Sequence, residues 1–303
     1  MGTSVPDSAC VGVLGAGRMG GGIAQVAAVA GHSVILQDLD DGAVLRARAG
    51  IEKALLRETE KDRLTPAAAE AARGRVRYVV SGDLSAFAPC GLVIEAIIER
   101  LGPKRESFAA LERVVAPEAV LATNTSALSI TTIAGVCQHP ERVVGLHFFN
   151  PAPVMPLVEI VQALTTSAET IATLREFVTS LGKTGVVCKD SPGFIVNRLM
   201  VPYLLGAIRA LEQGVATVEE IDTAVKLGLR HPMGPFELID YTGLDINLHV
   251  ANVFFDEFKD PSVAPPPLLK RMVLAGRLGT KVGRGFYEYD EKGQKKSPQT
   301  PTK

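Results

Sequence analysis

The 303-residue sequence has no closely spaced cysteines, no excess of charge of either sign and no long apolar run. Its four cysteines are scattered and lack CxxC spacing, so we expect reduced thiols, with neither a metal nor a disulfide, in a cytoplasmic protein. A net charge of −1 argues against nucleic-acid binding and against a polybasic membrane segment. No apolar stretch reaches the ~18 residues of a membrane span, and we expect no signal peptide because the first residues lack a basic flank and an apolar core.

What the sequence does contain is an alternation of short apolar runs with helical patterns over residues 9–190. Strands that alternate with helices form a mostly parallel, doubly wound sheet with helices on both faces, so we predict an α/β domain here. Helices are expected after the first, second and fourth strands and from about 168 to 181. The expected strands are 10–14, 33–38, 75–80, 92–97, 120–124, 143–148, 157–161 and 185–189.

The pattern changes after Lys189. A Ser-Pro-Gly turn at 191–193 is followed by helical patterns with almost no strand signal. We therefore predict an α/β domain in residues 1–190, with a loose tail at 1–8, and an all-helical substrate and dimerisation domain in 191–303, with disorder at 290–303. The helices expected in the second domain are 194–213, 217–228, 235–242, 244–258 and 266–276.

A glycine-rich motif, GAGRMG, follows the first expected strand and opens a helix. In this context it indicates a Rossmann-type dinucleotide-binding unit: Gly15 permits the tight turn, Gly17 lets a pyrophosphate approach the helix N-terminus, and Gly20 lets helix and strand pack closely. Asp38 ends the second strand, where a carboxylate binds both ribose hydroxyls and repels a 2′-phosphate. The next three residues, LDD, include no arginine, which favours NAD over NADP. The alternative is a glycine-rich turn whose Asp38 merely caps a helix.

A lone histidine and a lone carboxylate stand in two neighbouring apolar runs, VVGLHFF and PLVEIV. If residues 142–147 and 157–161 are strands joined by the proline-rich loop, they can pair antiparallel and bring His147 close to Glu159. A carboxylate on one imidazole nitrogen fixes the tautomer and stabilises the imidazolium, which leaves the other nitrogen to accept a proton. With the dinucleotide motif upstream, this favours a general base that oxidises an alcohol. A buried pair that only joins two strands is the alternative.

Together these motifs resemble those of the L-3-hydroxyacyl-CoA dehydrogenases, especially the bacterial 3-hydroxybutyryl-CoA type. The resemblance covers about residues 9–289, through GAGRMG, EAIIER, NTSALSI, GLHFFNP, LVEIV, DSPGFIVNR and LGTKVGRGFY. It implies hydride transfer between NAD and C3 of a (3S)-3-hydroxyacyl-CoA, in the first instance 3-hydroxybutyryl-CoA, by a homodimer. It leaves acyl chain length, direction and pathway open, with fatty-acid β-oxidation among the candidates.

The resemblance also implies roles for individual residues. His147 is the general base, Glu159 orients it, and Ser126 of NTS contacts the substrate 3-oxygen. Asn197 of GFIVNR lies by the acyl-CoA, and Asn150 borders the nicotinamide. The implied cofactor-binding residues are Gly15, Gly17, Met19, Gly20, Asp38, Glu99, Lys104, Ser126, Asn150 and Lys281.

Several of these residues have simpler explanations. Ser126 could cap a helix, and Asn197 could be a satisfied polar group at a helix start. Glu99 and Lys104 could be ordinary surface charges. One departure from the family pattern is Ala127, where relatives usually carry a second serine; we expect it to leave the chemistry of Ser126 intact but to shift its hydrogen bonding.

A contact with coenzyme A is suggested by Arg57 and Lys61, which are four residues apart on one face of an expected helix at 42–63. In the bacterial relatives, basic residues at these positions approach the CoA phosphates and adenine. A solvated basic face is the alternative explanation.

Two other functions stay open. One is a dehydrogenase of a free hydroxy or sugar acid on the same fold, because the fold alone does not fix the substrate. The other is a non-catalytic NAD-binding protein. Retention of His147, Glu159, Ser126 and Asn197 together argues against it, because a structural role does not need that set.

Overall fold

The computed structural model describes residues 10–296, and the chain divides into two compact units, with the division between Phe194 and Ile195. The first unit is built on an eight-stranded sheet of order β3-β2-β1-β4-β5-β6-β7-β8, in which all neighbours are parallel except β6 and β7. The predicted doubly wound, mostly parallel sheet is thus confirmed. The strands are β1 (Cys10–Leu14), β2 (Val34–Asp38), β3 (Val76–Val80), β4 (Cys90–Glu95), β5 (Val120–Thr123), β6 (Val143–Phe148), β7 (Leu157–Gln162) and β8 (Thr184–Lys189).

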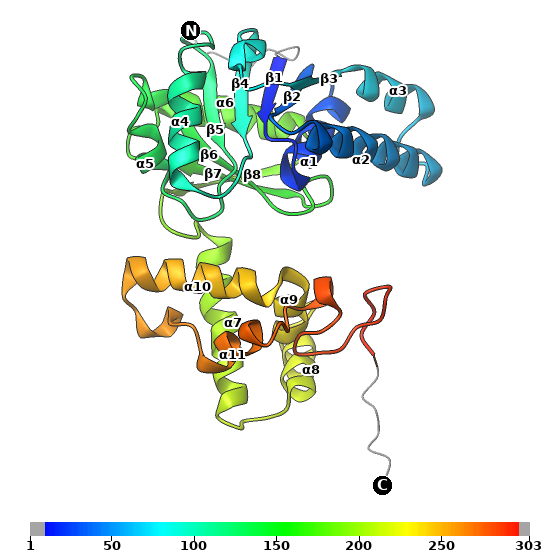
Figure 1. The fold of residues 1–303 in the computed structure, drawn as a ribbon, viewed down its shortest axis with the longest axis vertical. Helices are drawn as coiled ribbons and strands as arrows, with labels where there is room; N and C mark the ends of the chain where they lie inside the picture. The colour runs from blue at the N-terminus through cyan, green and yellow to red at the C-terminus, as the bar shows by residue number, and fades with distance from the viewer. Residues whose placement is uncertain (1–9, 297–303) are drawn as a thin grey trace. The chain divides into compact units, whose positions relative to one another are not determined.

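Helices cover both faces of this sheet (Figure 1). Alternate residues of a strand point to opposite faces, and here they belong to two different core clusters: Val13 to one and Leu14 to the other. The first cluster packs the sheet against α1, α2, α3 and α6; the second packs it against α4 and α5. The bounds are α1 (Arg18–Val29), α2 (Asp41–Glu60), α3 (Pro66–Gly74), α4 (Leu101–Leu111), α5 (Ile130–Ala134) and α6 (Ala168–Ser180), with 3-10 turns η1 (Leu84–Phe87) and η2 (Pro140–Arg142).

Two details between β2 and β3 differ from expectation. Helix α2 ends at Glu60 rather than near 63, because the chain leaves the helical conformation and Asp62 adopts a φ of +55°. Helix α3 was not expected at all. It starts with a capping bond from Ala68 N–H to Thr65 Oγ1 and buries Ala72 alone, so it has no apolar stripe that a pattern search could detect.

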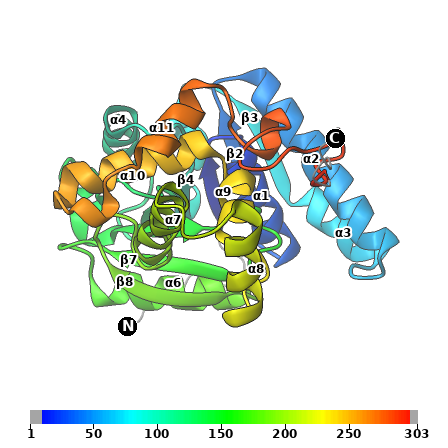
Figure 2. The ribbon, with the colours of Figure 1, turned by 90° about the horizontal axis from the view of Figure 1, so that it is seen from below.

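The second unit is helical, as predicted. Helix α7 packs against α9, α10 and α11 (Figure 2), around a core that includes Leu204, Ile208, Phe236 and Phe254. The bounds are α7 (Val196–Glu212), α8 (Val218–Gly228), α9 (Pro235–Thr242), α10 (Leu244–Phe258) and α11 (Pro267–Leu274), with 3-10 turns η3 (Pro261–Val263) and η4 (Thr280–Val282). No helix among residues 10–296 is both long enough and apolar enough to cross a bilayer.

Two buried carboxylates anchor the C-terminal segment to this unit. Asp240 accepts hydrogen bonds from the backbone N–H groups of Phe286 and Tyr287 and from the Tyr289 hydroxyl. Asp222 accepts one from the Tyr287 hydroxyl at 2.8 Å. The polar contacts of the GRGFYEY stretch are therefore satisfied inside the unit, which gives the stretch a structural role.

The segment expected to be disordered has a defined beginning. Residues 290–296 form a turn in which Gly293 N–H donates to the Asp290 carbonyl, and the Lys295 Nζ lies 2.8 Å from Glu237 Oε1. Residues 297–303, like the loose tail expected at 1–8, lie outside the described residues.

Candidate active site

The glycine loop joins β1 to α1 in a form that fits a dinucleotide. Gly15 has a φ of +106°, and a Cβ there would collide with the backbone of Ala96. A Cβ on Gly20 would collide with the carbonyl of Gly15, whereas one on Gly17 would meet nothing within 4 Å. The backbone of Gly17 is thus open, and among the described residues no side chain caps the N-terminus of α1. The first N–H groups of this helix are available for a pyrophosphate. Met19 packs against the core.

Asp38 closes this loop from the end of β2. Its Oδ2 accepts a hydrogen bond from Ala16 N–H at 2.7 Å, and its Oδ1 accepts one from Asp40 N–H at 3.0 Å. These bonds hold the carboxylate beside the loop, where ribose hydroxyls can reach its remaining lone pairs. One neighbour was not predicted: Arg46 of α2 places Nη2 3.2 Å from Asp40 Oδ2. This cation is occupied by Asp40 rather than offered to a 2′-phosphate.

His147 and Glu159 are partners. They are directly opposite each other in the antiparallel pairing of β6 and β7, and Nδ1 of the histidine lies 2.7 Å from Oε2 of the glutamate. Their residues are 6% and 1% exposed. An ionised carboxylate can only accept, so Nδ1 carries the hydrogen and Nε2 is the basic nitrogen. The predicted strand pairing is confirmed.

Two aromatic rings flank the imidazole of His147. The ring of Phe149 lies 4.5 Å away between centroids, and the ring of Phe194, at the end of the first unit, lies 5.5 Å away in an edge-on arrangement. The two rings supply apolar contacts to the imidazole, whose polar contact is the Glu159 carboxylate. The second phenylalanine of HFFNP and the phenylalanine of SPGF were not predicted to contact it.

Glu99, Lys104 and Ser126 form one network at the ends of β4 and β5. Lys104 is 1% exposed, and its Nζ lies 2.7 Å from Glu95 Oε1 and 3.3 Å from Glu99 Oε2. Glu99 Oε1 accepts hydrogen bonds from the backbone N–H of Ser126 at 2.9 Å and from its hydroxyl at 3.3 Å. Burial opposes ionisation of Glu99, but the Lys104 ammonium and the bonds from Thr125 and Ser126 outweigh it and lower its pKa.

Glu95 is the member of this network that the sequence did not reveal. It is completely buried and accepts hydrogen bonds from Lys104 and from the Thr123 hydroxyl. Lys104 is thus no surface charge, and its single ammonium group is shared between two carboxylates. A lone carboxylate at the end of an apolar strand, Glu95 in LVIE, is a signal of the kind that identified Glu159.

The loop after β5 is tied directly to the end of β6. Asn124 Oδ1 accepts a hydrogen bond from Phe148 N–H at 2.9 Å, next to His147. Ser126 follows two residues later and is half-buried. It is not the cap of α5, which is Ser129. Asn150 is exposed after β6.

Two predicted site residues belong to the second unit. Asn197 lies in the first turn of α7 and is half-buried. Lys281 lies in η4, where both oxygens of Asp245 accept hydrogen bonds from its Nζ at 2.6 Å.

The proposed coenzyme A contacts lie at the end of α2. Arg57 and Lys61 are both exposed, and Lys61 is the C-cap residue rather than part of the helix. Nearer the glycine loop, a hollow of about 520 Å³ between α1 and α2 is lined by Gly17, Arg18, Arg46 and Pro153 among others. The open helix N-terminus and the Arg18 side chain suit a phosphate-bearing ligand.

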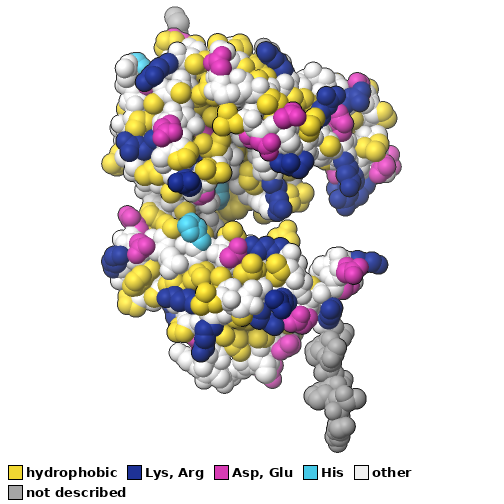
Figure 3. All heavy atoms as spheres, in the orientation of Figure 1, with side chains coloured by type: hydrophobic (Ala, Val, Ile, Leu, Met, Phe, Trp, Pro, Cys, Tyr) yellow, Lys and Arg dark blue, Asp and Glu magenta, His cyan; other side chains and the backbone are white. Residues whose placement is uncertain are grey.

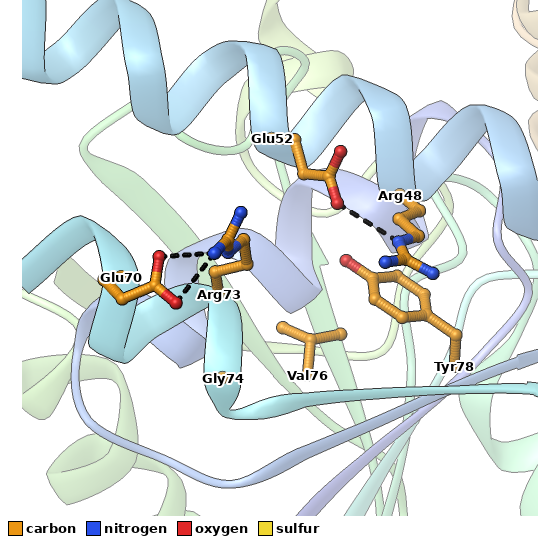
Figure 4. Close-up of a pocket in the computed structure, with 7 residues that line it drawn as sticks. All are labelled: Arg48, Glu52, Glu70, Arg73, Gly74, Val76 and Tyr78. Carbon is orange, nitrogen blue, oxygen red and sulfur yellow. Dashed lines mark hydrogen bonds and ion pairs between the residues drawn. The ribbon is translucent and has the colours of Figure 1, made fainter.

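A second hollow, of about 470 Å³, lies between α2, α3 and β3 (Figure 4). Its charges pair with one another: Arg48 Nε lies 3.1 Å from Glu52, and Arg73 Nη2 lies 2.6 Å from Glu70. The Arg48 guanidinium also lies 5.8 Å from the centre of the Tyr78 ring. Because these charges are already paired, we assign no cofactor contact to this hollow.

In the first unit, the dinucleotide loop, Asp38 and the Ser126 network lie at the carboxyl ends of parallel strands. His147 lies near the end of β6, and Glu159 is opposite it in β7. That edge is where open α/β sheets bind ligands, at the point where the strand order reverses between β1 and β4. Among residues 10–296, no group of three or more histidine, cysteine or acidic side chains is arranged to hold a metal. The fold and site define the class of NAD-dependent dehydrogenases.

Comparison with known proteins identifies the family within this class. Residues 10–191 match the family described as "3-hydroxyacyl-CoA dehydrogenase, NAD binding domain", and residues 193–289 match "3-hydroxyacyl-CoA dehydrogenase, C-terminal domain". The chain belongs to the 3-hydroxyacyl-CoA dehydrogenases, and NAD is its cofactor.

Individual relatives are similar over nearly the whole chain. The 3-hydroxybutyryl-CoA dehydrogenase of Mycobacterium tuberculosis is 49% identical over 281 residues, 92% of this chain and 98% of that protein. The human mitochondrial hydroxyacyl-coenzyme A dehydrogenase is 43% identical over 91% of this chain and 90% of its own. The crystal structure of (S)-3-hydroxybutyryl-CoA dehydrogenase from Ralstonia eutropha superposes with a TM-score of 0.90 at 41% identity, covering 94% and 100% of the two chains.

Proposed function

We propose that this chain is a 3-hydroxybutyryl-CoA dehydrogenase in which His147 is the general base and Glu159 orients it. The observation that carries the proposal is the 2.7 Å bond between these two buried side chains, at the ligand-binding edge of the sheet. The names of the relatives support the substrate, since two that match nearly all of this chain are described as acting on 3-hydroxybutyryl-CoA.

The chemistry assigned to each residue follows from its contacts. Bound NAD supplies the acceptor for the hydride from substrate C3. His147 Nε2 accepts the proton of the 3-hydroxyl, and the resulting imidazolium is stabilised by Glu159 through Nδ1. In the reverse direction His147 returns the proton to the 3-oxygen. A base of this kind contributes ~10²–10⁴-fold to the rate.

Ser126 is the proposed donor to the substrate 3-oxygen. Its hydroxyl makes a 3.3 Å bond to Glu99, longer than the 2.9 Å bond from its backbone N–H to the same oxygen. The backbone bond holds the loop while the hydroxyl is free to turn to a ligand. Neutral donors stabilise an oxygen that gains negative charge without trapping it as a salt. We assign the same role to Asn197, at the acyl-CoA.

The substrate assay tests this proposal directly. NADH oxidation is measured with acetoacetyl-CoA, with longer 3-ketoacyl-CoA substrates and with free acetoacetate, and each series is repeated with NADPH. We expect turnover with the short CoA ester and NADH, and at least ~10-fold weaker use of NADPH, because Asp38 repels the 2′-phosphate. Preference for the free acid would favour the hydroxy-acid alternative; absence of turnover with every substrate would revive a non-catalytic role.

The proposed contacts with coenzyme A can be tested separately. We propose that Arg57 and Lys61 contact the CoA phosphates and adenine, with exposed side chains as the supporting observation. The double variant Arg57→Gln, Lys61→Gln should raise KM for acetoacetyl-CoA but leave KM for acetoacetyl-pantetheine, which lacks those groups, unchanged. Arg175→Gln on the exposed face of α6 is the control. Equal effects on both substrates would contradict the contact.

We also propose a cytoplasmic homodimer joined through the helical unit. The supporting observation is exposed apolar surface. Many apolar side chains of this unit are exposed, and Figure 3 shows apolar side chains in yellow between the charged groups of the unit. Exposed apolar surface of this kind is typical of protein interfaces. The large exposed apolar residues of the unit include Leu199, Val215, Leu227, Leu229, Tyr241, Ile246, Leu274 and Val282.

A further inference from the structure

Cys10 and Cys90 are 80 residues apart in the sequence but adjacent in the sheet. They are register partners at the start of the neighbouring parallel strands β1 and β4, and their Sγ atoms lie 3.4 Å apart. Both are free cysteines. A disulfide joins its sulfurs at about 2.05 Å, so these two need to approach by little more than an ångström.

We propose that Cys10 and Cys90 form a redox-active dithiol, a modification site at which a low-molecular-weight disulfide converts the pair into a reversible intramolecular disulfide. The pairing of β1 with β4 holds the two thiols at this separation in the folded protein. The reaction therefore needs a small rotation of two side chains and no rearrangement of the sheet.

The two thiols have different chemistry. The hydrogen bond with Cys90 lowers the pKa of the Cys10 thiol to about 7; partial burial opposes this and the charge of Arg77 assists it. The same hydrogen bond, together with burial, raises the pKa of Cys90. Cys10 is partly exposed whereas Cys90 is 2% exposed. Cys10 is thus the attacking thiolate and Cys90 the resolving thiol.

The added disulfide is the only other reactant that this thiol–disulfide exchange needs. The Cys10 thiolate attacks one sulfur of the added disulfide, whose S–S bond breaks, and one small thiolate leaves with the electron pair. Cys90 then loses its proton to solvent and attacks the Cys10 sulfur of the mixed disulfide, which expels the second small thiolate. The two protein thiols together lose two electrons, and the added disulfide gains them and becomes two thiols.

The site lies away from the cofactor edge. Cys10 and Cys90 begin their strands, whereas the glycine loop and Glu95 stand at the opposite, carboxyl ends. We therefore expect oxidation to leave turnover within about twofold. A cross-link that closes a long loop restricts the unfolded chain, so the oxidised protein should melt at a higher temperature than the reduced protein.

Two other cysteines serve as internal controls. Burial raises the pKa of Cys137 to about 11 and that of Cys188 to about 12, so both remain protonated at neutral pH. Serine in place of either should leave the reaction of the dithiol unchanged, and neither should take up the small thiol before Cys10 does.

The experiment treats the full-length reduced protein with glutathione disulfide at neutral pH, blocks the remaining thiols and maps the peptides by mass spectrometry without reductant. We expect a Cys10–Cys90 linkage that dithiothreitol reverses, a persistent glutathione adduct on Cys10 in Cys90→Ser, and neither product in Cys10→Ser. Absence of the linkage in the wild type, or earlier modification of Cys137 or Cys188, would overturn the proposal. The melting temperature of the oxidised wild type is a second readout that needs no variant: no rise would count against the cross-link.

Discussion

At the scale of single residues, the buried ionisable groups at the ligand-binding edge have ionisable partners. His147 has Glu159, and Lys104 has both Glu95 and Glu99. An unpaired charge in these positions costs several kcal/mol, so removing one partner changes the behaviour of the other. Variants of the partner therefore report on the histidine without touching it.

Glu159→Gln is the variant that separates orientation from proton transfer. The neutral amide stabilises an imidazolium less than a carboxylate does, and its NH₂ can donate to Nδ1, which favours the tautomer with hydrogen on Nε2. We expect kcat to fall by ~10²-fold or more with KM nearly unchanged, since the interaction is made mainly in the transition state. The measurement is steady-state NADH oxidation with acetoacetyl-CoA.

The chain offers a matched control for this variant. His139 and Glu141 form an exposed pair, with Nδ1 3.3 Å from Oε1. Glu141→Gln changes the same type of pair where no substrate is expected, so it should keep the wild-type rate. If both glutamine variants lost activity equally, or neither did, the role given to Glu159 would be wrong.

The histidine–glutamate pair could be predicted from sequence because both residues interrupt apolar strands joined by a short proline-rich loop. Local pattern suffices there, since the two strands are consecutive and the loop turns the chain back. The partnerships of Glu95 with Lys104 and of Cys10 with Cys90 escaped prediction. The second depends on β1 lying next to β4, an order that no local pattern encodes.

At the scale of elements, the predicted strands and long helices match the structure closely because the central strands are apolar runs buried on both faces and the long helices each bury one apolar face. Helix α3 was missed because it buries a single alanine. In the helical unit, the buried carboxylates Asp222 and Asp240 fix the last described segment against α8 and α9. Their partners come from GRGFYEY, which follows the predicted cofactor residue Lys281 and for which the sequence predicted no structural role.

Glu237 gives α9 a pH-dependent stability. Partial burial opposes its ionisation, but hydrogen bonds from Lys295 and Lys226 dominate and lower its pKa to about 2. Because the folded-state pKa lies below the ordinary glutamate pKa of 4.5, this stabilisation is present above pH 4.5 and is lost as the pH falls from there towards about 2. Burial raises the pKa of Asp222 and Asp240. Ionisation of these two groups therefore lowers the stability of the fold as the pH rises, the reverse of the Glu237 effect.

The variant Glu237→Gln isolates this contribution. Its melting temperature should lie below that of the wild type at neutral pH, and the difference should disappear as the pH approaches about 2. Thermal melts across this pH range measure it, with Glu257→Gln on the exposed side of α10 as the control. A difference that stays constant with pH would show that the ion pairs are not its cause.

At the scale of the whole molecule, the homodimer proposal makes a prediction about mass. Light scattering should give about twice the 32.1 kDa of one chain. Leu227→Asp together with Leu229→Asp should lower the mass towards that of one chain, because these side chains are 78% and 61% exposed and a charge opposes their burial. Leu164→Asp, at a position 89% exposed in the first unit, should remain dimeric. A wild type that stays monomeric would contradict the proposal.

If the imidazole of His147 moves the proton of the substrate hydroxyl, the variant His147→Gln removes the group that carries out this step. Turnover of acetoacetyl-CoA with NADH is measured alongside the Kd of NADH. We predict a fall in kcat of ~10²–10⁴-fold with NADH affinity unchanged within about threefold, because the glycine loop and Asp38 are untouched. A variant that binds NADH normally and turns over at close to the wild-type rate would show that His147 is not the general base.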